Sequence, residues 1–164
     1  MKRWNRIRLM TVVAVTLAMG LSTAAHARKF KRYTFGSLLA RVSVPAKWQK
    51  VKQTTEKLKF RFGKAGSLSI RRKFKTVNIH KVAEAIKAGW RSKGWKILKD
   101  KRGKLKGTNH PAFVLRAHHK GAKVKIETYV VQARKRVYVL TFGNLARKFK
   151  PKLYNKVMLT FDAI

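Results

Sequence analysis

The sequence predicts an α+β fold in which an antiparallel sheet of about six to eight strands packs against a central helix and a C-terminal helix. Three observations lead to this prediction. Several runs alternate apolar and polar residues with the period of two typical of strands, and turn-length segments join them. The middle of the chain changes to helical spacing, and the last residues return to it. Helices placed in this order can cover an antiparallel sheet.

The first strands lie in the N-terminal half of the domain. Residues 38–44 alternate before a proline ends the run, and residues 48–53 are expected to continue as a short edge strand. Residues 57–62 and 68–73 alternate on either side of the Gly63–Gly66 turn. This arrangement predicts a hairpin that carries basic side chains on its outer face.

The central helix is predicted from a change of period after Asn78, which suits an N-cap. One face of this helix carries the apolar residues Ile79, Val82, Ala83, Ile86 and Trp90. The polar side is predicted to hold Lys81, Glu84, Lys87 and Arg91. Gly94 is expected to end the helix.

The second half of the domain repeats the pattern of strands followed by a helix. Four strand-like runs cover residues 95–105, 113–118, 123–130 and 137–142. The first of them contains a weak turn signal at Arg102–Gly103. Pro151 then suits the first turn of a C-terminal helix with Leu153, Val157 and Phe161 on one face.

The N-terminus predicts export. Residues 1–8 carry four basic side chains and no acid, residues 9–21 carry no charge, and Ala25-His26-Ala27 supplies the small residues of a cleavage site. The uncharged run of 13 residues is shorter than the roughly 20 apolar residues that span a bilayer. We therefore expect residues 1–27 to be a signal peptide cleaved after Ala27. The mature protein is expected to be periplasmic or secreted and to have no transmembrane segment.

The mature chain, residues 28–164, is expected to fold as one domain. The leader takes four of the 42 basic residues and none of the five acids, which leaves a net charge of +33 with histidine neutral. Regularly spaced Val, Leu, Ile, Phe and Trp argue against the disorder that so high a charge would otherwise favour. The absence of cysteine excludes disulfides, thiolate metal sites, cysteine nucleophiles and a lipoprotein anchor.

The excess of positive charge predicts an anionic partner. The candidate anion-binding residues are Lys57, Lys59, Arg61, Arg71, Lys73, Lys99, Lys101, Arg102, Lys104, Lys106, Lys123, Lys125, Arg147, Lys148 and Lys150. Those at alternate strand positions, from Lys57 to Lys73 and at Lys123 and Lys125, would form one cationic surface if their strands share a sheet. The residues from Lys99 to Lys106 are expected to form a dense basic hairpin, and those from Arg147 to Lys150 a second cluster.

The balance of lysine and arginine indicates how the partner would be bound. The mature chain has 26 lysines and 12 arginines, which favours diffuse attraction to phosphate over recognition of base edges. The expected partner is an anionic polymer, an anionic membrane surface or an acidic protein. A nucleic acid would be bound without sequence specificity.

Three stretches of the chain resemble the PsbP-like family, which includes the extrinsic subunit of photosystem II, a Ran-binding nuclear transport factor and many exported bacterial proteins. They are Val44-Pro45-Ala46-Lys47-Trp48, Asn109-His110-Pro111-Ala112-Phe113-Val114, and Val137-Tyr138-Val139-Leu140-Thr141-Phe142 with the helix after it. The resemblance covers nearly the whole mature chain. It implies a two-layer or three-layer arrangement around an antiparallel sheet, used for binding and assembly, and it brings no shared catalytic residues. The high lysine content departs from what this fold requires.

The sequence gives little support to an enzyme. Its five carboxylates stand in no catalytic motif, and no G-x-S-x-G elbow, P-loop or dinucleotide fingerprint occurs. His118 and His119 are adjacent on a strand and would point to opposite faces, so no metal site, cofactor or catalytic residue is expected. Two alternatives to polyanion binding stay open. One is an assembly factor for an acidic envelope complex, with the charge serving solubility. The other is a hydrolase whose cleft brings His118 or His119 to Glu127 or a serine.

Overall fold

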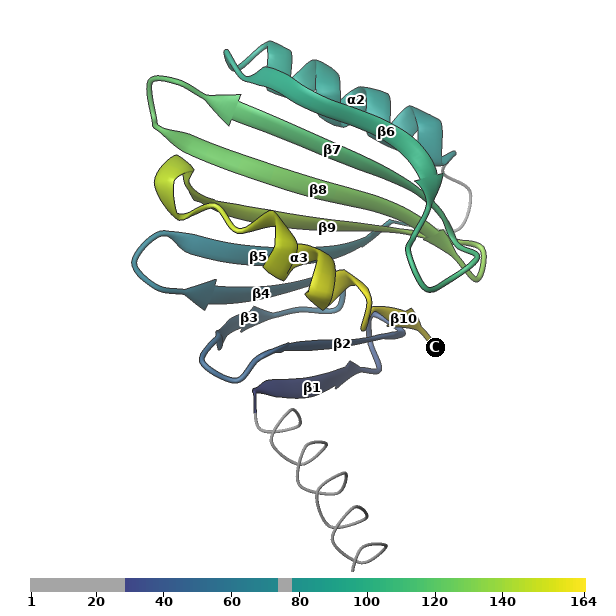
Figure 1. Cartoon of the computed structure of the whole chain (residues 1–164). Helices are drawn as coiled ribbons and strands as arrows, with labels where there is room; N and C mark the ends of the chain where they lie inside the picture. Colours follow the sequence, from purple (N-terminus) through teal and green to yellow (C-terminus); the bar gives the residue numbers. More distant parts are fainter. Residues whose placement is uncertain (1–28, 74–77) are drawn as a thin grey trace, which may run out of the picture.

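The computed structural model describes residues 29–73 and 78–164, so the predicted signal peptide and its cleavage site at Ala27 lie outside the described residues. In this part of the chain two antiparallel sheets, of seven and three strands, pack with two α-helices (Figure 1). The α+β class and the antiparallel sheet with packed helices are confirmed. The chain forms more strands than predicted, because part of it builds the second, smaller sheet.

The seven-stranded sheet is the scaffold of the domain. In spatial order its strands are β3 (Gln49–Gln53), β4 (Lys57–Phe62), β5 (Gly66–Lys73), β9 (Arg136–Leu145), β8 (Val124–Ala133), β7 (Pro111–His119) and β6 (Lys96–Lys104). The β4–β5 hairpin forms as predicted, with Phe62 paired to Gly66 next to the turn. The run after Trp48 forms the edge strand β3, and all of its residues are exposed.

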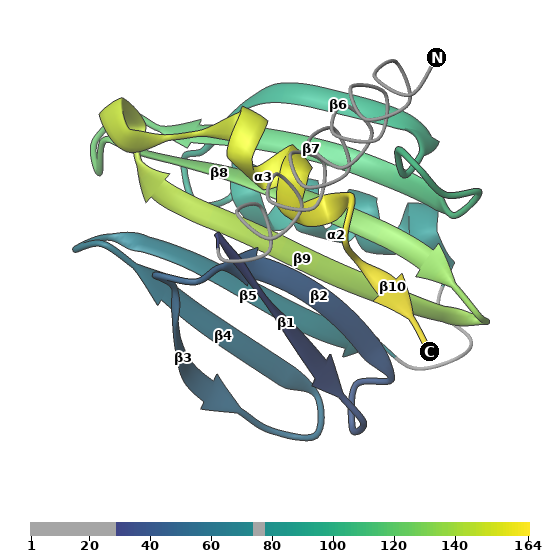
Figure 2. The same cartoon turned by 60° about the horizontal axis from the view of Figure 1, so that its bottom comes forward.

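The three-stranded sheet is composed of β1 (Phe30–Phe35), β2 (Ala40–Pro45) and β10 (Asp162–Ala163). β2 alternates as expected, whereas β1 and β10 were not predicted. β10 has only two residues and pairs with β2, and Arg41 forms an ion pair with Asp162 across that pairing. Figure 2 shows β1 and β2 lying across the face of the larger sheet near β4 and β5.

Helix α2 (Ile79–Arg91) covers one face of the larger sheet, against β6, β7 and β8. The Asn78 side chain caps it by accepting a hydrogen bond from the His80 backbone N–H at 2.8 Å. The predicted apolar stripe packs inward, with Ala83 fully buried. The placement of Lys87 on the polar side was wrong: its side chain is 8% exposed because its ammonium group is paired with Glu84 at 2.6 Å and Asp100 at 2.5 Å.

The opposite face of the larger sheet is covered by the small sheet, a 3₁₀ turn η1 (Ala146–Lys148) and helix α3 (Pro151–Met158). Pro151 stands in the first turn as predicted. The helix is shorter than its apolar spacing suggested and ends at Met158, yet Phe161 beyond it is buried in the same core. β7, β8 and β9 are therefore buried on both faces, with separate apolar clusters under α2 and under α3, whereas β4 and β5 are covered only on the α3 side.

Strand β6 corrects another prediction. It extends as one strand from Lys96 to Lys104, with a register shift between Ile97 and Lys99, and Gly103 pairs with Ala112 inside the strand, so the turn predicted at Arg102–Gly103 does not form. The chain reverses only after Leu105, which is 4% exposed and receives a hydrogen bond on its carbonyl from Thr108. The basic residues of this segment thus lie along the edge strand of the sheet.

Candidate anion-binding site

Strands β4 and β5 bring one group of the predicted residues together. Their register places Lys57 opposite Arg71, and places Lys59 and Arg61 opposite serines. Residues paired across neighbouring strands point to the same face of a sheet. The intervening residues of both strands are buried in the core. Five cations therefore share the outward face, which is called the open basic face below: Lys57, Lys59, Arg61, Arg71 and Lys73.

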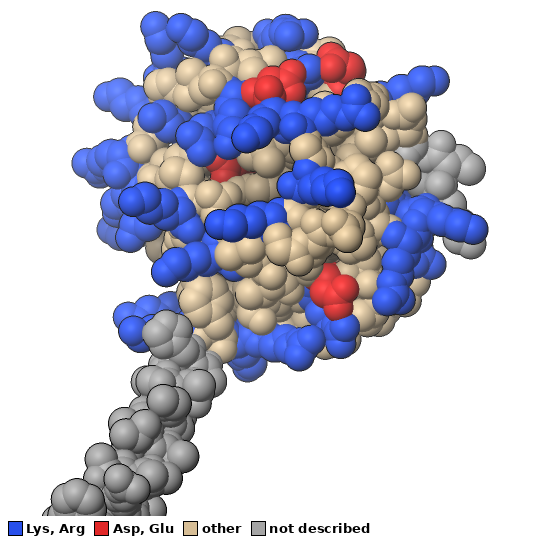
Figure 3. Space-filling view, turned by 45° about the vertical axis from the view of Figure 1, so that its right-hand side comes forward, with Lys and Arg blue, Asp and Glu red and all other residues tan. Residues whose placement is uncertain are grey.

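The open basic face lies on the same side of the sheet as α2 but beyond the strands that α2 contacts. Arg61, Arg71 and Lys73 are exposed, and Lys57 and Lys59 are half-buried. Basic side chains are widely distributed over the molecule, and Figure 3 shows one face on which acidic side chains occupy only a few places. The open basic face is the part of this distribution where one rigid hairpin fixes several cations relative to one another.

A row of hydroxyl groups continues this face across the sheet. Ser69 pairs with Lys59 on one side and with Thr141 of β9 on the other. Thr141 and Thr128 of β8 are hydrogen-bonded through their Oγ1 atoms at 3.0 Å. The Ser69 Oγ atom is buried and has no hydrogen-bond partner among the described residues. Because the Ser69 Oγ atom is buried and the two threonine hydroxyls are bonded to each other, this row forms part of the sheet packing, and the cations are the groups that reach solvent.

Lys57 and Arg71 repel each other at the open end of the β4–β5 hairpin, which is the end away from its turn. Arg71 lowers the pKa of Lys57 below its ordinary value, with smaller contributions from burial, Lys59 and Lys52. This end borders a hollow of about 330 Å³, which is lined by Lys52, Thr54, Glu56, Lys57, Arg71, Arg72 and Lys73. An anion in the hollow would relieve the repulsion between Lys57 and Arg71, so its binding would favour the protonated lysine.

The remaining strand cations do not join this surface. Lys125 pairs with Asn144, and following the register shows that it lies on the opposite face of the sheet, with Phe142 and Leu68 in the neighbouring positions. Lys123 precedes β8 in a turn, with a φ of 51°. The single surface predicted to include Lys123 and Lys125 was therefore wrong, because β8 presents its apolar residues to α2 on the side where β4 presents lysines.

The basic residues of the predicted hairpin also divide between two faces. Lys99 and Lys101 pair with Arg116 and Val114, which point toward α3. Arg102 and Lys104 point toward the α2 side, and Lys106 lies in the turn that follows β6. All of these lysines except the half-buried Lys99 are exposed. The segment is basic, but its strand geometry separates the charges that the sequence placed in one cluster.

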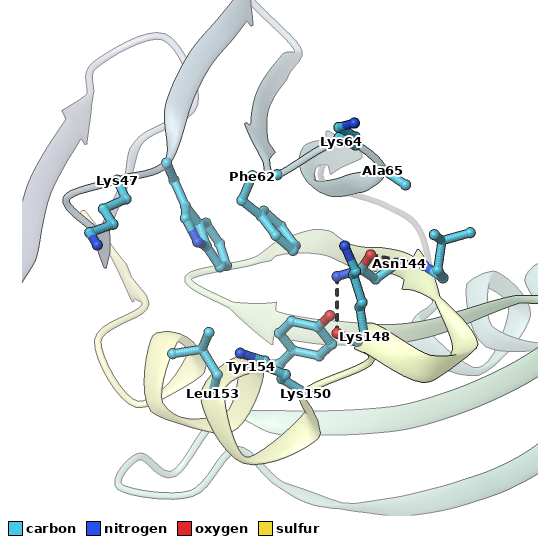
Figure 4. A pocket seen from close by; sticks show the side chains of 12 residues that line it. Lys47, Phe62, Lys64, Ala65, Asn144, Lys148, Lys150, Leu153 and Tyr154 are labelled. Atoms are coloured by element: carbon cyan, nitrogen blue, oxygen red, sulfur yellow. Dashed lines mark hydrogen bonds between the residues drawn. The ribbon is translucent and has the colours of Figure 1, made fainter.

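The third predicted cluster lies near the start of α3. Arg147 is exposed in η1, while Lys148 and Lys150 border a second hollow of about 490 Å³ between β4 and α3 (Figure 4). Sequence reasoning missed the other basic residues of this hollow, Lys47 and Lys64. They come from two turns that lie far from residue 148 in the sequence, although Lys64 stands inside the Gly63–Gly66 turn signal.

Most of the acidic side chains form ion pairs with basic side chains of the same fold. Asp162 is paired with Arg41, Glu84 and Asp100 with Lys87, and Glu127 with Arg116. Glu127 is 1% exposed and also accepts a hydrogen bond from the Tyr129 hydroxyl at 2.6 Å. In residues 29–73 and 78–164 these pairs engage three cations. The acids therefore stabilise the fold and neutralise little of the basic surface.

The histidines take part in local packing. His119 Nδ1 accepts a hydrogen bond from the Ala122 backbone N–H at 3.0 Å, and its ring packs edge-on against Trp95. Glu127, the carboxylate named in the hydrolase alternative, is held by Arg116 and Tyr129. Within the described ranges no group of three or more His, Asp or Glu side chains is arranged to hold a metal ion.

Comparison with known proteins shows a likeness of fold. No protein-family model and no curated protein matches the chain. A crystal structure of a protein from Bacteroides thetaiotaomicron VPI-5482 matches with a TM-score of 0.56 and 12% identity, over 83% of this chain and 49% of the other. Our chain thus spans about half the length of that protein. PA94 from Pseudomonas aeruginosa, a protein of unknown function, matches with a TM-score of 0.53 and 17% identity, over 80% of this chain and 94% of PA94.

A helix that crosses a bilayer needs about 20 mostly apolar residues. Neither helix in the described part of the chain combines the length and apolar character needed to cross a bilayer.

Proposed function

We propose that the mature chain is an exported binding protein, not an enzyme, that associates electrostatically with an anionic polymer or an anionic envelope surface through the open basic face. The observation that carries the proposal is the set of five cations fixed on one uncovered sheet face. Assignment to the PsbP-like family is part of the proposal, and it is consistent with a binding role.

The spacing of the strand residues suits a repeating anion. Alternate residues of a strand lie about 7 Å apart along it, and the neighbouring strand lies about 4.8 Å away. Lys57, Lys59 and Arg61 therefore form a row, with Arg71 and Lys73 extending the surface toward the end of β5. Such a row can contact successive phosphates or sulfates of one chain without reading their sequence. The lowered pKa of Lys57, caused first by Arg71, is consistent with repulsion between these two cations that a bound anion would reduce.

Retention on heparin, DNA, lipopolysaccharide and anionic liposomes at about 50 mM salt tests the proposal, because electrostatic association is strongest at low salt. The first variant replaces the open basic face with glutamine at Lys57, Lys59, Arg61, Arg71 and Lys73. The matched control removes the same charge from exposed lysines spread over other elements: Lys29, Lys81, Lys93, Lys120 and Lys156.

The two variants carry the same net charge, so a difference between them reports the geometry of the face. With duplex DNA as the probe, log K for binding falls linearly with log salt concentration. The open-face variant should make this slope shallower by up to about four, and the control variant should change it much less. Equal effects of the two variants would mean that total charge attracts the polymer and that the face has no special part. If wild-type protein is not retained on any of these probes, the proposal fails, and capture of one acidic protein would then favour the assembly-factor alternative.

A further inference from the structure

The hollow between β4 and α3 has the dimensions of a small-molecule site. Its volume of about 490 Å³ falls within the range of roughly 300–1,000 Å³ found for ligand pockets. It is formed by four segments: Lys47–Trp48 before β3, the end of β4 with the β4–β5 turn as far as Ala65, the end of β9 with the η1 turn as far as Lys148, and the residues from Lys150 to Tyr154 at the beginning of α3. The sheet separates it from the open basic face, because Phe62 points to the side of the core and Arg61 to the outer side.

The base of the hollow is aromatic. The rings of Trp48 and Phe62 stack with their centroids 4.0 Å apart, and the Phe62 ring is tilted against the Tyr154 ring with 6.2 Å between their centroids. Tyr154 stacks in turn on Phe142 of the core at 4.6 Å, which fixes its ring. Leu153 completes the apolar lining. Figure 4 shows Phe62 and Tyr154 on facing sides of the hollow, on β4 and on α3. An apolar body could cover this surface and remove it from water.

The rim of the hollow is basic. Lys47, Lys64, Lys148 and Lys150 border it and are exposed, and none of them is in an ion pair within the described residues. The loop that carries Lys148 is held in place by Asn144, whose Nδ2 donates to the Lys148 carbonyl oxygen at 3.0 Å. The same Asn144 side chain accepts a hydrogen bond from the Leu145 backbone N–H at 2.8 Å.

A buried tyrosine adds a third feature. Tyr154 lines the hollow and its side chain is fully buried. Burial raises the pKa of its hydroxyl, while the Lys150 backbone and the Asn144 side chain beside it lower that pKa. The Tyr154 ring is therefore a fixed wall of the hollow.

We propose that this hollow binds an amphipathic organic anion, a phosphate or carboxylate attached to an apolar aryl or acyl body. The apolar body covers Phe62 and Leu153, and the anionic group is held by the rim lysines. The site does not depend on the proposed function, because none of its residues belongs to the open basic face.

Isothermal titration calorimetry of the mature protein at about 150 mM NaCl tests this site, since diffuse attraction between exposed charges is screened beyond about 8 Å under these conditions. The probes are 1-naphthyl phosphate, decyl phosphate below its micelle concentration and inorganic phosphate. Both organic phosphates should bind at least about tenfold more tightly than inorganic phosphate, because only they bury apolar surface. A preference for naphthyl phosphate would identify an aromatic ligand, and a preference for decyl phosphate an acyl ligand.

Two double variants locate the binding. Lys64→Ala with Lys148→Ala should weaken both organic phosphates about tenfold through loss of charge-assisted hydrogen bonds. Lys81→Ala with Lys93→Ala removes the same charge from exposed positions on and just after α2 and should change the affinity by less than about twofold.

Three results would overturn the proposal: no advantage of the organic phosphates over inorganic phosphate, equal losses in the two double variants, or loss of binding in the glutamine variant of the open basic face instead. The last result would place the ligand on the other side of the sheet and leave the polyanion proposal standing. Failure of heparin or DNA binding, in contrast, would not affect the prediction for this hollow.

Discussion

Replacing Glu127 with glutamine tests whether the acids of this basic protein serve to hold its fold together. Glu127 is 1% exposed and accepts three hydrogen bonds: from Arg116 Nε at 2.7 Å, from Arg116 Nη2 at 2.5 Å and from the Tyr129 hydroxyl at 2.6 Å. Glutamine keeps the shape of the side chain but removes its charge. It also turns an amide NH₂ toward groups that are themselves donors, so part of the network is left unsatisfied.

The expected loss of stability follows from these contacts. Breaking a buried ion pair by removing one partner costs about 3–5 kcal/mol. The Arg116 side chain is 27% exposed and can recover some hydration, which places the cost for Glu127→Gln near the lower end, at about 3 kcal/mol. For a domain of this size that corresponds to a decrease in Tm of roughly 10 °C. Urea and thermal unfolding followed by far-UV circular dichroism at pH 7 would measure both quantities.

The control is Glu56→Gln, which changes the net charge by the same amount at an exposed position. Its effect should stay within about 0.5 kcal/mol. The difference between the two variants should persist in 1 M NaCl, where the Debye length is about 3 Å and long-range repulsion is screened. If both variants lose the same stability, or if salt abolishes the difference, Glu127 acts only by reducing the total charge and the reasoning about its buried network is wrong.

Three further predictions concern the free energy of unfolding, measured by denaturation, and each compares a variant with a matched variant or with the wild type at several pH values. Gly66→Ala should destabilise by about 1–3 kcal/mol, because its Cβ would lie 2.4 Å from a backbone oxygen at the end of β4, whereas Gly103→Ala meets nothing within 4 Å and should be tolerated. Tyr154→Phe should cost less than about 1 kcal/mol, since its hydroxyl makes no well-aligned hydrogen bond among the described residues, whereas Tyr129→Phe should lose about 1–2 kcal/mol with its hydrogen bond to the buried carboxylate. The pKa of Lys57 in the folded state lies below its unfolded value of 10.5, so the unfolded state binds more protons. The free energy of unfolding should therefore rise as the pH rises through the folded pKa toward 10.5, and the Lys57→Gln variant should lack this rise. A loss of stability for Tyr154→Phe equal to that for Tyr129→Phe, or tolerance of alanine at Gly66, would contradict the contacts on which these expectations rest.

The elements that could be predicted from the sequence are those determined by local patterns. Helix α2 has a capping residue and an apolar stripe, and the β4–β5 hairpin has alternation on both sides of a glycine turn. The turn expected at Gly103 failed because that glycine adopts ordinary strand geometry and pairs with β7. β10 could not be predicted, since a strand of two residues has no periodicity and exists only because β2 lies beside it.

The candidate site shows a different limit. Alternation tells which residues of one strand share a face, and for β4 and β5 this was enough to group Lys57, Lys59 and Arg61. It does not tell which face of the whole sheet they join. Lys125 of β8 lies on the other face of the sheet from the lysines of β4, and only the pairing of the strands between them reveals it. The aromatic hollow joins residues 47–65 to residues 144–154, which lie about 80 residues further along the chain, so no local signal predicts it.

The placement of the acids explains how the domain carries its charge. A net charge of +33 over residues 28–164 would destabilise a compact state through self-repulsion, and acids scattered over the surface would reduce that repulsion slightly everywhere. The structure instead places Glu127 in the core and joins Asp100 to the buried Lys87, where each carboxylate stabilises one specific contact. No acid is paired with the cations of the open basic face in the described residues, and the repulsion between Lys57 and Arg71 lowers the pKa of Lys57, which an external anion can reverse. On this reasoning, a bound polyanion should stabilise the fold by more than the same polyanion stabilises the glutamine variant of the open basic face, and the difference in Tm at low salt measures that coupling.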